Sequence, residues 1–113
     1  MRSRTFARCV VLTAGVFVGC AAAKPAADMA AINDGKLVAQ RECSSCHAIG
    51  TEGASPRSDA PLFRIILSRY HSDTLETELV QGIKLGHPDM PIFELNPKAV
   101  DDLVVYLKSI QQK

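Results

Sequence analysis

Residues 43–47 read Cys-Ser-Ser-Cys-His, and this stretch decides the fold of the 113-residue chain. The pattern C-x-x-C-H is the signature for covalent attachment of a c-type haem. Two intervening residues on a helical turn place both thiols on one side of the backbone, where each can form a thioether with a haem vinyl group. The adjacent His47 then binds the iron as the proximal ligand. The predicted haem-binding residues are therefore Cys43, Cys46 and His47.

Two other chemistries use a C-x-x-C pair. A thioredoxin-like dithiol needs a βαβ context, but the alternation that marks strands is absent from this sequence. A zinc ion could take the two cysteines together with His71 and His87, but zinc sites favour a second closely spaced ligand pair. The motif therefore favours one covalently bound haem over a zinc ion or a free dithiol.

The first 23 residues read as a secretory signal. Three arginines among the first eight residues precede an apolar run over 9–19, and alanines at 21–23 suit cleavage. The apolar run is too short to span a bilayer as a mature helix. We expect residues 1–23 to be a signal peptide and 24–33 to be a linker with the start of the first helix. Residues 34–113 are then expected to form one domain.

Residues 16–20, Val-Phe-Val-Gly-Cys, resemble a lipobox, at which bacterial lipoproteins are cut before a cysteine that becomes acylated. Phe17 stands where a leucine is usual. Acylation of Cys20 and ordinary cleavage after Ala23 both remain open, and both predict export to the periplasm. Only an acylated Cys20 would hold the protein at a membrane surface.

Charge and size exclude some functions. Removal of residues 1–23 takes away three arginines and no acid, so the formal charge falls from +1 to −2. Nucleic-acid binding, which needs a basic face, is not expected. The remaining 90 residues contain no tryptophan and can build only a small core. A buried haem would supply the missing apolar mass.

The first helix is expected over residues 29–45, with Asp28 as its N-cap. Gly35 in its middle either lets another helix approach closely or marks a later helix start. The inward face is expected to be flanked by Leu37, Val38 and Arg41.

Two shorter helices are expected after a polar loop over 48–60. One covers 61–67, with a proline in its first turn. The other covers 73–83, where Asp73 and Glu76 resemble a capping box, and Gly82 and Gly86 are expected to end it.

Asn96 as N-cap and Pro97 as first residue start the last helix. Its apolar residues follow the spacing of one helix face, and they are Val100, Leu103, Val104 and Leu107. No strand is predicted, so the fold class is all-α, with three to five helices wrapped around the haem.

Met90 is the predicted second axial ligand. It is the only methionine after the haem motif, and Pro88 and Pro91 restrict the backbone around it. A methionine between prolines in a loop is poor core material. The rivals are His87, which would give bis-histidine ligation and a lower potential, and His71.

These features together resemble a class I (mono-haem) c-type cytochrome of the small bacterial periplasmic group. The resemblance covers about residues 34–107, and the order of its motifs differs from that of the four-helix cytochrome c′ type. Besides the haem motif it rests on four segments, which are residues 35–39, 60–63 (Ala-Pro-Leu-Phe), 86–91 (Gly-His-Pro-Asp-Met-Pro) with Phe93, and Tyr106-Leu107. It implies the cytochrome c fold. It also implies that the Pro61 carbonyl accepts the Nδ1 proton of His47.

The absence of tryptophan leaves the haem propionates without assigned partners. Arg57, Arg64, Arg69 and Tyr70 are candidates, although a solvated surface position is favoured for each. The apolar haem pocket is expected to include Leu62, Ile66, Leu79, Phe93 and Val104.

The resemblance implies one-electron transfer with His47 and Met90 as axial ligands, in a periplasmic or membrane-surface chain, and no catalysis of its own. The expected partners are redox proteins such as a cytochrome complex, an oxidase or a dehydrogenase. One alternative is a haem c subunit fixed to a dehydrogenase or oxidase complex. Another is a gas-binding haem sensor, which needs an open or easily vacated sixth position.

Overall fold

The structure is a computed structural model that describes residues 26–82 and 89–113. In this part of the chain it contains α1 (Ala26–Glu42), the 3-10 helix η1 (Phe63–Ser68), α2 (Ser72–Gln81) and α3 (Pro97–Ile110), and no strand. The all-α prediction is therefore confirmed. The predicted signal over 1–23, its Cys20 and the rival ligand His87 lie outside the described residues.

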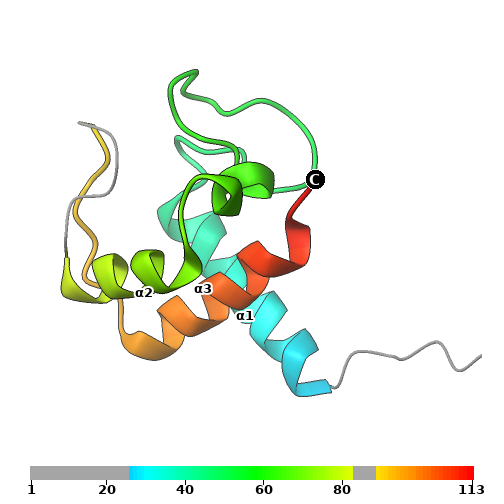
Figure 1. The fold of residues 1–113 in the computed structure, drawn as a ribbon, viewed down its shortest axis with the longest axis vertical. Coiled ribbons are helices and arrows are strands. Elements are labelled where there is room, and N and C mark those ends of the chain that lie inside the picture. Colours follow the sequence, from blue (N-terminus) through cyan, green and yellow to red (C-terminus); the bar gives the residue numbers. More distant parts are fainter. Residues whose placement is uncertain (1–25, 83–88) are drawn as a thin grey trace, which may run out of the picture.

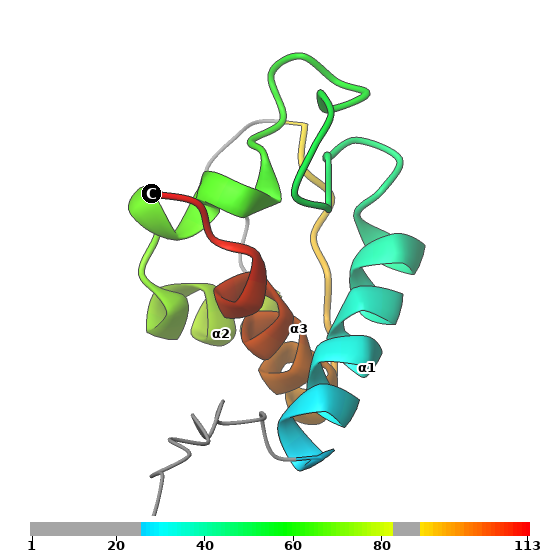
Figure 2. The same ribbon diagram turned by 90° about the vertical axis from the view of Figure 1, so that its right-hand side faces the viewer.

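α1 and α3 cross and form the centre of the fold (Figure 1, Figure 2). The crossing depends on Gly35, because a Cβ at this position would lie 2.0 Å from the carbonyl oxygen of Asp102 and 2.8 Å from the Cβ of Tyr106. Only a residue without a side chain lets the two backbones approach so closely. Of the two roles considered for Gly35, the close approach of another helix is confirmed.

The limits and the inward face of α1 differ from the prediction. The helix ends at Glu42, so the haem motif follows it as a turn, and Asp28 lies in its first turn instead of capping it. The buried residues of α1 are Gly35, Val38 and Ala39. Leu37 is 60% exposed, because the helical period that turns Gly35 and Val38 toward α3 turns Leu37 away from it.

α3 matches its prediction closely. The Asn96 side chain caps the helix by accepting a hydrogen bond from the Ala99 N–H at 2.9 Å, and Pro97 is the first helical residue. The four apolar residues predicted to share one face are all buried. Asp102 is also buried, and its carboxylate accepts a hydrogen bond from Lys98 one turn earlier. This pairing compensates the burial of a charge at the helix crossing.

α2 begins one residue earlier than predicted, and the predicted capping box is wrong. Its N-cap is His71, which makes no capping hydrogen bond with its side chain. Asp73 is thus already inside the first turn, where its charge favours the helix dipole. α2 ends at Gln81, two residues before the predicted bound, but Gly82 closes the helix as predicted, in the left-handed conformation with φ 66°.

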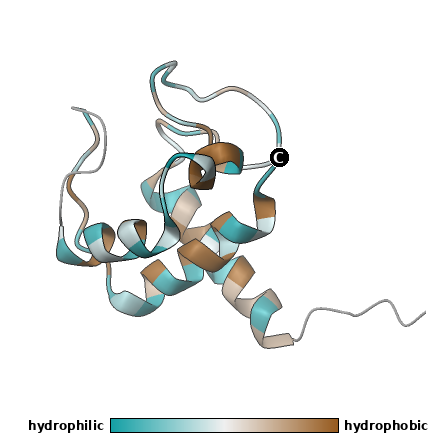
Figure 3. Ribbon diagram, viewed as in Figure 1, coloured by the Kyte–Doolittle hydropathy of each residue, from teal (hydrophilic) through white to brown (hydrophobic). Residues whose placement is uncertain are grey.

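Apolar residues of α1, η1, α2 and α3 form one buried cluster. η1 and α3 carry hydrophobic stretches, which are brown in Figure 3. The buried cluster consists of Val38, Ala39, Phe63, Ile66, Leu75, Leu79, Val100, Leu103, Val104, Tyr106 and Leu107.

No helix within residues 26–82 and 89–113 has the length and apolar character needed to cross a membrane.

The C-terminal residues fasten α3 to η1. The Gln111 side-chain amide donates to the carbonyl oxygens of Phe63 (2.8 Å) and Leu107 (2.9 Å). Its oxygen accepts a hydrogen bond from the Leu67 N–H at 3.1 Å. One glutamine therefore satisfies backbone groups on both elements.

We expect Gln111→Ala to lower the free energy of unfolding by about 1.5 kcal/mol, because hydrogen bonds of this kind contribute about 0.5–1.5 kcal/mol each. Urea denaturation of the haem-loaded protein measures this change. Gln112→Ala is the control, because its exposed side chain bonds only the Thr51 carbonyl among the contacts described. An equal loss in both variants would contradict the role of Gln111.

Candidate haem site

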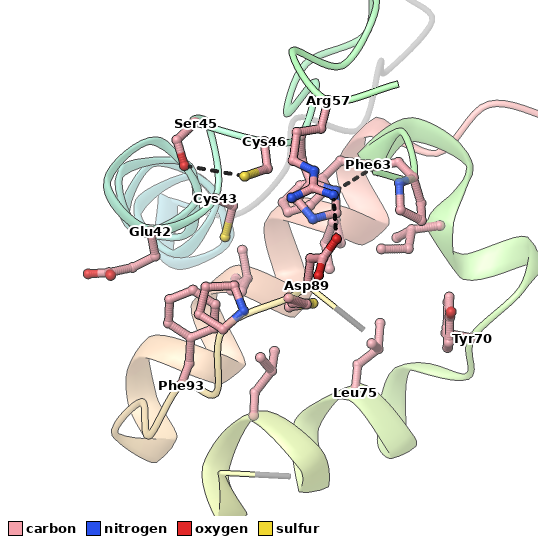
Figure 4. Close-up of a pocket in the computed structure, with 18 residues that line it drawn as sticks. Glu42, Cys43, Ser45, Cys46, Arg57, Phe63, Tyr70, Leu75, Asp89 and Phe93 are labelled. Carbon is pink, nitrogen blue, oxygen red and sulfur yellow. Dashed lines mark hydrogen bonds and ion pairs between the residues drawn. The ribbon is translucent and has the colours of Figure 1, made fainter. Parts of the chain in front are cut away.

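A pocket opens between the end of α1, η1, α2 and α3. Figure 4 shows Cys43 and Cys46 at the end of α1, with Leu75 entering from α2 on the other side. The lining consists of Glu42, Cys43, Ser45, Cys46, His47, Arg57, Pro61, Phe63, Ile66, Tyr70, Leu75, Leu79, Asp89, Met90, Pro91, Phe93, Leu103 and Leu107.

The two cysteines share one wall of this pocket, as the spacing of the motif predicts. The Cys43 N–H continues the hydrogen bonding of α1 with a bond to the Ala39 carbonyl at 2.9 Å. The carbonyl of Cys43 then accepts hydrogen bonds from the N–H groups of Cys46 (3.2 Å) and His47 (2.9 Å). This single turn brings both sulfurs and the imidazole to the same side of the chain.

Burial raises the pKa of the Cys43 thiol to about 12, and the negative charge of Glu42 adds to the effect. A buried site disfavours a thiolate because an anion loses its hydration there. A thioether carries no charge, so the position suits a sulfur that is covalently bonded to a porphyrin better than one that acts as a free nucleophile.

His47 is only 7% exposed and is oriented by its neighbours. Its Nδ1 lies 2.7 Å from the carbonyl oxygen of Pro61, and its ring packs at 5.2 Å between centroids against Phe63. A carbonyl accepts only from a protonated nitrogen, so this contact selects the tautomer in which Nε2 carries the lone pair that binds a metal. The hydrogen bond that the resemblance implied is therefore present.

Met90 is partly buried, packs against the apolar cluster and lines the same pocket as the haem motif. The structure thus brings Met90 to the same pocket as Cys43, Cys46 and His47, although Met90 lies far from them in the sequence. His71 is exposed and does not line the pocket.

The four candidate propionate partners occupy different places. Arg57 and Tyr70 line the pocket, whereas the Arg64 guanidinium donates to the Gly53 carbonyl and Arg69 is exposed outside the pocket. Hydrogen bonds to Asp59 and then Asp89 raise the pKa of Arg57 above its ordinary value. Arg57 is therefore a permanent cation at the edge of the pocket.

The predicted apolar wall is partly correct. Ile66, Leu79 and Phe93 line the pocket, but Leu62 and Val104 do not. Val104 is 1% exposed and belongs to the apolar cluster, since its place on α3 turns it away from the pocket. The apolar lining residues that the sequence analysis did not assign to the pocket are Phe63, Leu75, Leu103 and Leu107. Two of them, Leu103 and Leu107, lie on the predicted face of α3, so the helical period could have found them.

The donor set and the pocket fit one haem. The thiols of Cys43 and Cys46 lie on one wall with the His47 imidazole beside them. The Met90 side chain lines the same space, and most of the remaining lining is apolar. Within residues 26–82 and 89–113 no three His, Cys, Asp or Glu side chains are grouped as a metal-ion site.

The fold and this site define a small all-helical protein built around a covalently attached haem. A family model described as Cytochrome c matches residues 32–111, which is more than half of the chain. The chain therefore belongs to the cytochrome c family, and its cofactor is covalently bound haem c. Comparisons with curated proteins and with solved structures gave no significant match.

Proposed function

We propose that the protein is a one-electron carrier whose haem iron is held by His47 on one face and by Met90 on the other. The family supports haem-based electron transfer. One observation supports His47 and Met90 as the two iron ligands. Both residues line the same pocket as Cys43 and Cys46.

The bound haem supplies the one-electron redox change. His47 keeps one orientation because the Pro61 carbonyl and the Phe63 ring hold its imidazole. As an iron ligand, the soft thioether of Met90 would favour the reduced state and raise the potential. The apolar wall acts in the same direction, because a dry environment disfavours additional positive charge. Side chains that stay in place in both redox states add little barrier to electron transfer.

Two alternatives involve the same pocket. A haem c subunit fixed to a dehydrogenase or oxidase would use the same chemistry with a permanent partner. A gas-binding sensor would need a vacant position opposite His47, where the carrier has Met90. We propose a carrier without catalysis of its own, because the pocket wall is mostly apolar and supports a redox cofactor better than the binding of a polar substrate.

We propose that residues 1–23 export the protein to the periplasm, where residues 34–113 exchange electrons with redox proteins such as an oxidase, a dehydrogenase or a cytochrome complex. The basic start and apolar run of the first 23 residues support export. The intact mass of the mature protein tests the processing, because it distinguishes cleavage after Ala23 from an acylated Cys20.

Met90→Ala tests the ligand assignment. We expect the ferric wild-type protein to show a methionine–iron charge-transfer absorption band, and the variant to lose this band while retaining its covalent haem. The potential should fall by on the order of 0.1 V, within the ~0.8 V range that axial ligands span. Absorption spectra in both redox states and a redox titration measure these effects.

Met29→Ala is the control, because Met29 lies on α1 and is 46% exposed. This variant should keep the band and the potential. Reduced wild-type protein should bind carbon monoxide poorly, whereas reduced Met90→Ala should bind it readily. Persistence of the band in Met90→Ala would rule out this ligand, and ready binding of carbon monoxide by the wild type would favour the sensor.

A further inference from the structure

Arg57 connects the two segments that supply the predicted haem ligands. Its backbone N–H donates to the carbonyl oxygen of Cys46 at 3.1 Å, so its position is fixed on the turn that carries the haem motif. Its guanidinium Nη2 donates to Asp89 Oδ2 at 2.8 Å, and Asp89 immediately precedes Met90. Figure 4 shows the Arg57 side chain reaching Asp89 at the pocket.

A second carboxylate orients the guanidinium. Nε and Nη2 of Arg57 donate to the two oxygens of Asp59 at 3.0 and 2.8 Å. This two-pronged contact fixes the plane of the guanidinium, and the fixed plane leaves Nη2 directed at Asp89 as well. We call residues 89–91 the methionine segment. Arg57 reaches this segment through Asp89, and its own backbone and side chain are both held by hydrogen bonds.

We propose that Arg57 is a positioning residue that keeps Met90 at the iron by tying the methionine segment, through Asp89, to the turn that carries Cys46 and His47. This inference rests on the proposed axial role of Met90 and adds the contact that stabilises it. A ligand that displaces Met90 from the iron has to move residues 89–91. Arg57 opposes this movement because it holds Asp89.

The size of the effect follows from the exposure of the pair. The Arg57 side chain is 39% exposed and that of Asp89 is 63% exposed. Exposed ion pairs contribute modestly, and salt screens them. We therefore expect about a two- to fivefold change in the equilibrium between Met90 bound to the iron and Met90 displaced from it, and a smaller change at high ionic strength.

Imidazole binding to the ferric holoprotein measures this equilibrium, because imidazole is neutral at mildly alkaline pH and has to displace Met90 to reach the iron. We expect Arg57→Gln and Asp89→Asn each to lower the imidazole dissociation constant about two- to fivefold. The double variant should show no more than the larger single effect, since both changes remove the same contact. Arg57→Lys should recover part of the wild-type affinity.

Arg64→Gln is the matched control. It removes the same charge, but among the described residues the Arg64 guanidinium bonds the Gly53 carbonyl and makes no bond to residues 89–91. Its dissociation constant should equal that of the wild type. Raising the salt concentration should lower the wild-type constant toward that of Arg57→Gln and leave the variant unchanged.

Two results would overturn the proposal. One is wild-type affinity in Asp89→Asn with a change in Arg57→Gln, which would mean that Arg57 acts on a haem propionate instead of on Asp89. The other is additive effects in the double variant. Failure of the axial assignment itself is distinguishable, because the wild-type protein would then lack the methionine–iron band and Met90→Ala would not alter imidazole binding.

Discussion

Gly35→Ala is expected to lower the free energy of unfolding of the haem-loaded protein by about 3 kcal/mol. Overpacking typically costs about 1–3 kcal/mol, and the upper end applies here because the added methyl group meets rigid backbone. The added methyl group would lie 2.0 Å from the Asp102 carbonyl oxygen and 2.5 Å from its carbon. Alanine favours the helix over glycine by about 1 kcal/mol, which is already included in the net figure. Thermal or urea unfolding of the holoprotein measures the difference.

The sign of this change separates local from tertiary effects. In an isolated helix Gly35→Ala would be stabilising, so a variant as stable as the wild type would show that the α1–α3 contact is looser than described. Gly50→Ala is the control, since a Cβ at Gly50 meets nothing within 4 Å. We expect its stability to stay within about 0.5 kcal/mol of the wild type.

Replacement of both Cys43 and Cys46 by alanine is expected to abolish covalent haem attachment completely in a host that attaches haem. Each sulfur would otherwise form one thioether, and no other cysteine lies in residues 26–82 and 89–113. The helical content should also fall sharply, because the domain is small and the pocket would lose the cofactor that fills it. Haem staining on a denaturing gel, intact mass and circular dichroism measure these losses.

Ser44→Ala is the control within the same motif. The Ser44 hydroxyl donates to the Gln40 carbonyl on the exposed side of the turn and does not line the pocket. This variant should retain its haem and its helical spectrum. Covalent haem on the chain that lacks both cysteines would contradict the attachment site.

Local sequence signals predicted much of this protein. Asn96 and Pro97 marked the start of α3, and Gly82 marked the end of α2, because capping depends on residues within one turn. The haem motif is local for the same reason, since one turn of the backbone places both sulfurs and the imidazole together.

Local sequence signals gave two wrong predictions, one for the N-cap of α2 and one for the buried face of α1. Asp73 is a good capping residue, yet α2 begins at Ser72 and leaves Asp73 inside the helix. Leu37 is apolar, yet it is exposed, because the approach of α3 selects the face of α1 that carries Gly35. For Leu37, the packing of α3 against α1 decided which face of the helix is buried.

The sequence by itself determined the cofactor, the all-helical class and the start of α3, since these depend on spacing and on contacts within a few residues. Only the tertiary structure showed that Gln111 fastens α3 to η1, and that Arg57 reaches Asp89 beside Met90. These contacts join residues that are 32 and 48 positions apart. No periodicity or capping rule links such residues, because their meeting depends on how the whole chain closes around the pocket.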